Sequence, residues 1–327
     1  MTGAIVVCTW GSGREGVPDG AEEVLTLARR VSGALQADLN WLVLGTMPER
    51  TVQVAARYGV AGVDHVGDPR LDTFQPDLYV EALAQYCGRQ SPKVLLFSQA
   101  YGTRLMAPRL AGRLGCAVVM NGVDIDVAGE GRLEVTASGY GGDTRSRYVL
   151  GGAAPHIVAV LPNAVLPEPL QGATASPPVR AIDVDLSGDA ERVRVLEPAR
   201  AEGPRLEDAE IIVSGGRGLG KPENYKLIEE LAEALGGMPG ASRPIVDDGW
   251  TDPSRWIGLT GKIVRPNLYI ACGISGASQH MAGCSAAKTL VAINRDPDAS
   301  IFRYARYGIV GDCLEIVPEL IRALEKR

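Results

Sequence analysis

The chain has 327 residues, of which 46% are apolar and 22% charged, and its formal net charge at pH 7 is -6. A chain of this length and apolar content can bury at least one large hydrophobic core, and two cores in two domains are favoured. Aromatic residues make up only 5%, beside 40 glycines and 21 prolines, so small aliphatic side chains must fill the cores, as in α/β proteins with buried parallel strands. A negative chain without clustered Lys and Arg is not expected to bind nucleic acid.

Cysteine and histidine spacing indicates neither a disulfide framework nor a metal site. The six cysteines contain no CxxC pair, and His65, His156 and His280 are not in metal-binding spacing. We therefore predict no metal site and no catalytic residue. The first residues lack the basic and apolar regions of a signal peptide, and no apolar run approaches the roughly 18 residues that span a bilayer. A cytoplasmic protein that is not embedded in a membrane is expected.

The first part of the sequence alternates strand-like apolar runs with amphipathic helical segments, as α/β units do. Strands are predicted at 4–9, 39–45, 93–98 and 117–121, and helices at 20–35, 50–58, 76–87 and 104–114. Three alternating segments then predict antiparallel strands, at 133–139, 144–150 and 156–161. A stretch rich in Pro, Ala and Ser follows, with an edge strand predicted at 179–186. The first domain, 1–203, is thus expected to be mixed α/β.

The second domain, 204–327, returns to a clear α/β rhythm. Strands are predicted at 209–214, 268–272, 289–294 and 308–311, and helices at 225–235, 278–282 and 315–325. This alternation is typical of a doubly wound parallel sheet that binds a nucleotide.

Two glycine-rich turns follow predicted strands, where an open parallel sheet binds ligands. The turn Ser214–Gly220 departs from GxGxxG spacing because position 221 is Lys, and a plain strand-to-helix turn explains it equally well. Its Arg217 could screen a phosphate. The turn Cys272–His280 puts Ser275 before a helix, whose N-terminus favours an anion. Two such turns in one domain suggest a dinucleotide.

Four further side chains could either contact a ligand or have an ordinary structural role, and the sequence does not decide between the two. His280 could donate a hydrogen bond to a ring carbonyl, but a lone buried histidine is more often satisfied within the core. Arg243 precedes Pro244 in a segment predicted to be non-helical, where it could face a π system or form a surface ion pair. Asn294 and Asp312 follow strand ends and could meet ribose or adenine, or be ordinary turn residues.

The motifs of the second domain form one ordered series between roughly residues 209 and 320. The series includes Ser214–Gly220, Gly240–Arg243, Thr260–Val264, Leu268–Ala271, Gly273–Ala277, Gln279–His280, Val291–Asn294 and Tyr307–Asp312. Together they closely resemble the C-terminal FAD domain of the electron transfer flavoprotein alpha family. The first domain resembles that family more loosely, through 107–111 and 140–142.

The resemblance implies that the chain binds FAD and pairs with an electron transfer flavoprotein beta subunit, which its first domain contacts. It implies that Arg243 lies against the isoalloxazine, where a fixed cation stabilises the reduced, anionic ring. Thr260 is expected at the N5 and O4 edge of the flavin, and His280 at the N1 and O2 edge. The expected cofactor-binding residues are Arg217, Ser242, Arg243, Trp256, Gly258, Leu259, Thr260, Gly273, Ser275, Gly276, Ala277, Gln279, His280, Asn294 and Asp312.

One segment departs from the family. Where the family usually reads Gln-Val-Gly-Gln-Thr-Gly, this chain has Trp256 and Leu259 in place of the two amides. Trp256 is expected to stack on the cofactor or the partner subunit, and Leu259 removes a donor, so an unusual flavin affinity or potential is predicted. This departure favours a paralogue dedicated to one dehydrogenase.

The leading hypothesis is an electron carrier rather than an enzyme that converts a substrate. By resemblance it accepts electrons from a flavin-dependent dehydrogenase, such as an acyl-CoA dehydrogenase, and passes them to a quinone oxidoreductase or another acceptor. The alternatives are the alpha subunit of an electron-bifurcating NADH-dependent flavoprotein, an NAD-dependent enzyme on the same fold, and a nucleotide-binding module that has lost FAD. An NAD-dependent enzyme would need an acidic residue after the second strand of this domain to bind the ribose, and Asp247 and Asp248 are the candidates.

Overall fold

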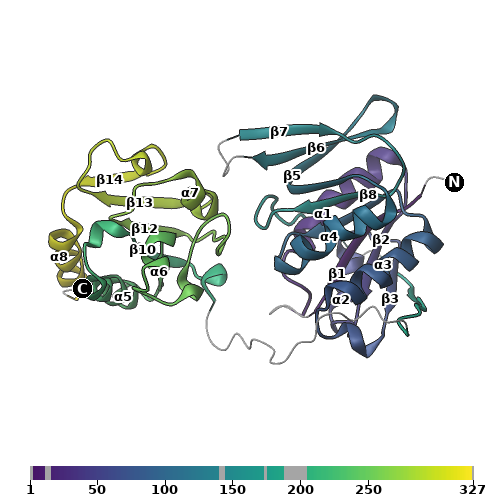
Figure 1. Ribbon diagram of the computed structural model, residues 1–327, viewed down its shortest axis with the longest axis horizontal. Helices are drawn as coiled ribbons and strands as arrows, with labels where there is room; N and C mark the ends of the chain where they lie inside the picture. The colour runs from purple at the N-terminus through teal and green to yellow at the C-terminus, as the bar shows by residue number, and fades with distance from the viewer. Residues whose placement is uncertain (1–2, 12–15, 140–143, 173–174, 188–204, 326–327) are drawn as a thin grey trace. The chain divides into compact units, whose positions relative to one another are not determined.

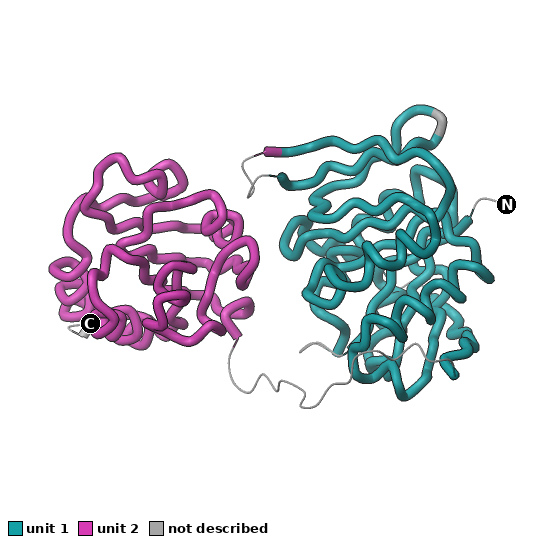
Figure 2. Tube along the Cα trace, in the orientation of Figure 1, with its two compact units in different colours: residues 1–139, 145–199 teal, residues 140–144, 200–327 magenta. Residues whose placement is uncertain are grey.

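The computed structural model (Figure 1) describes residues 3–11, 16–139, 144–172, 175–187 and 205–325. The chain divides into two compact units (Figure 2): unit 1 comprises residues 1–139 and 145–199, and unit 2 comprises residues 140–144 and 200–327. The domain boundary predicted near residue 203 lies outside the described residues. In the described part of the chain, no helix is both long and apolar enough to cross a bilayer.

Unit 1 is built on a large, mainly parallel sheet. Its strands are β1 (Ile5–Trp10), β2 (Leu39–Leu44), β3 (Gly62–Val66), β4 (Val94–Ser98), β5 (Val118–Ala128), β6 (Arg132–Gly139), β7 (Thr144–Val149), β8 (His156–Val160) and β9 (Val179–Ala181). In the described residues the sheet has nine strands in the order β7-β6-β5-β8-β4-β1-β2-β3-β9. The helices are α1 (Ala21–Leu35), α2 (Thr51–Arg57), α3 (Pro76–Gln90) and α4 (Tyr101–Leu114).

Helices cover both faces of this sheet, which explains why its central strands are apolar throughout. Side chains alternate along β1, so Ile5 and Val7 enter one core with α1 and α2, whereas Val6 and Cys8 enter the other with α3 and α4. The mixed α/β fold predicted for the first domain is confirmed.

The predicted strand directions are partly wrong. β5 and β6 pair antiparallel, as expected, but β8 lies between β4 and β5 and is parallel to both. Alternation in a sequence does not encode strand direction, and β8 is buried on both faces, as central parallel strands are. Strand β3 was not predicted, because its apolar run is interrupted by Asp64 and His65.

A buried carboxylate joins the edge strand β9 to its neighbour β3. The Asp64 side chain is only 1% exposed, and it accepts hydrogen bonds from Arg180 Nε at 2.8 Å and from the Tyr86 hydroxyl at 2.6 Å. Arg180 lies on β9 and its side chain is 49% exposed. The pairing satisfies a charge that would be costly to bury alone.

Replacing Arg180 by Leu is expected to lower the free energy of unfolding by about 2 kcal/mol, because the buried Asp64 carboxylate loses a charged donor. Arg30→Leu is the matched control, since Arg30 pairs with Asp124 and both side chains are nearly half exposed. That change is expected to cost less than about 0.5 kcal/mol. Urea unfolding measures both, and equal costs would contradict the role given to Asp64.

Unit 2 contains a parallel sheet with helices on both faces. In the described residues its strands are β10 (Ile211–Gly215), β11 (Met238–Ala241), β12 (Leu268–Cys272), β13 (Thr289–Asn294) and β14 (Tyr307–Val310), in the order β11-β10-β12-β13-β14. Each neighbouring pair is parallel. The helices are α5 (Lys226–Ala234), α6 (Arg243–Asp247), α7 (Ser278–Cys284) and α8 (Cys313–Glu325).

The helices of unit 2 divide between two cores. Helices α5 and α8 pack on the face of the sheet that carries Val213 and Ile270. Helix α7 packs on the opposite face, which carries Ile212 and Tyr269. The predicted doubly wound parallel sheet is therefore confirmed. From β10 the chain proceeds to β11 on one side and then returns to β12 on the other. In such sheets, ligands bind beside the carboxyl ends of the strands where the order reverses, here between β10 and β12.

Candidate functional site

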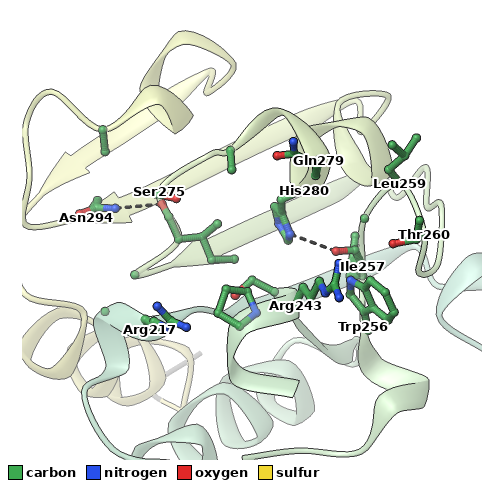
Figure 3. Close-up of a pocket in the computed structure, with 18 of the residues that line it drawn as sticks. Arg217, Arg243, Trp256, Ile257, Leu259, Thr260, Ser275, Gln279, His280 and Asn294 are labelled. Atoms are coloured by element: carbon green, nitrogen blue, oxygen red, sulfur yellow. Dashed lines mark hydrogen bonds between the residues drawn. The ribbon is translucent and has the colours of Figure 1, made fainter. Parts of the chain in front are cut away.

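A cavity of about 750 Å³ lies in unit 2 and is lined by the residues that follow β10, β11, β12 and β13 (Figure 3). Thirteen of the fifteen residues that the sequence analysis singled out for cofactor binding line it. Gly276 and Asp312 do not. The walls also contain Gly218, Pro244, Ile257, Ile274, Asp296 and Ala299.

The two glycine-rich turns touch through their backbones on one side of the cavity. Gly215 and Cys272 are register partners, so both turns begin at the same level of the sheet. The N–H of Gly218 donates to the carbonyl of Gly273 at 2.9 Å. A Cβ on Gly218 would lie 2.5 Å from the Cα of Gly273, so no larger residue fits there without a backbone shift. Glycine is required here for close approach.

Arg243 projects from the start of α6, and this corrects the expectation of a non-helical segment. Ser242 is extended, Arg243 is the first residue of the helix, and Pro244 is accepted in the first turn because no N–H is needed there. Arg243 Nε donates to the Asp247 carboxylate at 3.1 Å, and the arginine side chain is 64% exposed. A permanently charged guanidinium thus lies on the cavity wall.

The loop after Trp256 forms another part of the wall. Ile257 N–H donates to the Ala241 carbonyl at 2.9 Å, and Leu259 N–H donates to the Gln279 carbonyl at 2.8 Å. These bonds join the loop to the end of β11 and to α7. Trp256, Gly258, Leu259 and Thr260 consequently line the same cavity as Gln279.

The imidazole of His280 is bonded within the chain through both nitrogens. Nδ1 lies 3.1 Å from the Ile257 carbonyl, which can only accept, so Nδ1 carries the proton. Nε2 lies 2.9 Å from the Tyr269 hydroxyl and therefore accepts from it. Burial lowers the pKa of His280 to about 4, although the bond to Ile257 acts in the opposite direction. The ring lines the cavity as a neutral group, and donating to a ligand would require one bond to break.

Arg217, Ser275 and Asn294 lie at the other end of the cavity from Trp256 and Thr260 (Figure 3). Arg217 is largely exposed, with its Nε 3.6 Å from the Asp248 carboxylate. The amide of Asn294 donates to the carbonyl of Ile274 at 2.9 Å and so fixes the second turn.

Gly276 and Asp312 have other roles in this structure. Gly276 has a φ of 84°, and a Cβ there would lie 2.3 Å from the nitrogen of Ile301, so it allows the turn to pack against the next segment. The Asp312 carboxylate accepts from the Leu314 N–H at 2.9 Å at the start of α8. Their proposed contacts with a cofactor have no support in the cavity wall.

Several apolar residues of the wall were not predicted, among them Ile274 and Ala299. Ile274 could have been found from its place between Gly273 and Ser275 in the second turn. No local signal marks Ala299, which reaches the wall only through the folding of the segment after β13.

Stability is expected to fall as the pH is lowered from about 6.5 to about 4. In this window an unfolded histidine binds a proton while folded His280 does not, so acid favours unfolding by up to about 3 kcal/mol. His280→Gln is expected to remove this part of the pH dependence. Urea unfolding of both proteins between pH 4 and 7 measures it, and parallel curves would contradict a neutral buried imidazole.

Comparison with protein families accounts for both units. Residues 12–187 match the electron transfer flavoprotein domain, and residues 205–285 match the electron transfer flavoprotein FAD-binding domain. The second match includes the turns after β10 and β12, Arg243 and the Trp256 loop.

Individual relatives align with nearly the whole chain. An electron transfer flavoprotein subunit alpha of Thermoanaerobacterium thermosaccharolyticum is 36% identical over 94% of this chain and 93% of its own length. That of Bacillus subtilis is 35% identical over 91% and 90%, and a FixB protein of Azorhizobium caulinodans is 34% identical over 93% and 84%. The chain therefore belongs to the electron transfer flavoprotein alpha-subunit family, with FAD as the cofactor of the domain in its last third.

Proposed function

We propose that this chain is the FAD-carrying alpha subunit of a heterodimeric electron transfer flavoprotein and that its second domain holds the cofactor in the cavity of unit 2. The observation that carries the proposal is the meeting of thirteen predicted residues around about 750 Å³. Cofactor sites typically measure about 300–1,000 Å³ and are apolar with a few placed polar groups. Gly218 and Gly273, which meet where the two turns touch, both line the cavity and carry no side chain that would occupy it.

The polar residues divide along the cavity in a way that suits a dinucleotide. We assign the pyrophosphate and adenosine to the end with Arg217, Ser275 and Asn294, and the isoalloxazine to the end with Trp256 and Thr260 (Figure 3). The bound flavin supplies the redox chemistry, and the chain supplies binding, orientation and charge.

Arg243 supplies the charge at the isoalloxazine end. The cations among the described cavity residues are Arg217 and Arg243, and His280 is neutral near pH 7. A fixed cation attracts negative charge that arrives on the ring, so Arg243 is expected to raise the potential of the flavin. His280 orders the wall through its bonds to Tyr269 and Ile257.

A beta subunit is the expected partner, because the relatives are named as alpha subunits. Unit 1 exposes large apolar side chains on α4, Tyr101 and Leu105, and on β7, Tyr148 and Val149. We assign the partner contact to this unit, since exposed apolar side chains are typical of interfaces. A flavin-dependent dehydrogenase as electron donor and a quinone oxidoreductase or another electron acceptor complete the proposal.

The proposed location is the cytoplasm. All six cysteines are free, which suits that reducing compartment.

An NAD-dependent enzyme has less support. The second strand of unit 2, β11, ends at Ala241 and is followed by Ser242 and Arg243 instead of an acidic residue. The candidates Asp247 and Asp248 lie at the end of α6 and face Arg243 and Arg217. An electron-bifurcating flavoprotein carries a second flavin in its partner, so one flavin per heterodimer separates the proposal from that alternative.

The proposal is tested by purifying the chain with its beta subunit and recording the visible spectrum. Flavin absorbance is expected, with about one FAD released per alpha chain on denaturation. A complex without flavin would contradict the proposed function.

Replacing Arg243 by Gln is expected to weaken FAD binding and to lower the midpoint potential. A unit charge about 4 Å away contributes roughly 1 kcal/mol in water and 4 kcal/mol near a protein surface. Because Arg243 is exposed, we expect a contribution in the lower part of this range, about 1–2 kcal/mol. For a one-electron step this corresponds to a decrease in the midpoint potential of roughly 40–85 mV. Redox titration of the heterodimer measures it. Arg217→Gln is the control, because it should weaken binding while leaving the potential nearly unchanged.

A further inference from the structure

Trp256 and Arg243 form a contact within the cavity wall (Figure 3). The guanidinium carbon of Arg243 lies 5.4 Å from the centroid of the indole ring. This distance is within the range of a cation–π interaction, for which Trp provides the best ring.

The indole is fixed by the loop that follows it. A Cβ on Gly261 would lie 2.8 Å from the Cγ of Trp256, and one on Gly258 would lie 3.3 Å from its Nε1, so both glycines pack closely against the ring. Lys262 N–H donates to the Trp256 carbonyl at 2.8 Å and closes the loop. The ring is also partly buried against the core that contains α5 and α8.

Arg243 has little else that fixes its position. Its ion pair with Asp247 spans four residues of one short helix, and both side chains are more than half exposed. Pairs of this kind stabilise a geometry weakly and are screened by salt. The indole supplies a second contact from a different part of the chain, and two contacts restrict the guanidinium more than one does.

We infer that Trp256 is a positioning residue, which holds the Arg243 guanidinium against the cavity wall and thereby raises both the affinity and the potential of the flavin. The inference rests on the proposed function. Trp256 acts through Arg243, so its contribution should disappear when the charge of Arg243 is removed.

A double-mutant cycle on the full chain with its beta subunit tests this. The proteins are the wild type, Trp256→Gln, Arg243→Gln and the double variant, and the readouts are the FAD dissociation constant from flavin fluorescence and the midpoint potential. Trp256→Gln is expected to raise the dissociation constant about two- to five-fold and to lower the midpoint. In the Arg243→Gln background it should change the constant by less than about 1.5-fold and leave the midpoint unmoved.

Two further variants keep the result interpretable. Trp256→Phe retains an aromatic face and should remain within about two-fold of the wild type. Trp250→Phe alters another partly buried tryptophan of the same core outside the cavity wall and should change neither readout. Thermal unfolding of each variant establishes that it is folded.

The outcomes separate the inference from the proposed function. Equal effects of Trp256→Gln in the two Arg243 backgrounds would mean that the indole acts independently of Arg243, by shaping the loop or by contacting the cofactor directly, and this would overturn the inference. No effect in either background would overturn it as well. A wild-type heterodimer that binds no FAD would instead contradict the proposed function itself.

Discussion

The site depends on a contact between two stretches of backbone. Glycines after β10 and β12 let the two turns meet without side chains between them, and the bond from Gly218 to Gly273 holds them together. Because the strands are parallel and end in register, this contact lies at the carboxyl edge where the sheet order reverses. The cavity opens beside it, and the residues after β11 and β13 complete the wall.

The electrostatics of the cavity follow from how its polar groups are held. His280 is buried and bonded on both sides within the chain, so it contributes a neutral ring. Arg243 is exposed and weakly paired, so it keeps its charge free to act on a ligand. The indole of Trp256, which belongs to the loop that carries Thr260, contacts the Arg243 guanidinium. His280 therefore helps to fix the structure of the cavity wall, whereas Arg243 supplies the charge at its surface.

Local patterns predicted most of the strands and the edge at which the site lies. They failed where the pattern was interrupted, as in β11, which contains Pro239 and Gly240, and where direction depends on distant partners, as in β8. Residues that follow strand ends could be grouped from the sequence because strand ends share one edge of a parallel sheet. Trp256, Leu259 and Thr260 follow no strand end, and only the resemblance to the family placed them at the site. The bond between Tyr269 and His280 was not predictable, because it depends on how α7 packs on the sheet.

The claim that the cavity of unit 2 holds the flavin is tested most directly by a crystal structure of the heterodimer loaded with FAD. The account predicts electron density for the isoalloxazine beside Arg243 and Thr260, with the pyrophosphate near Ser275. Density for the cofactor at a site that none of these residues reaches would contradict it.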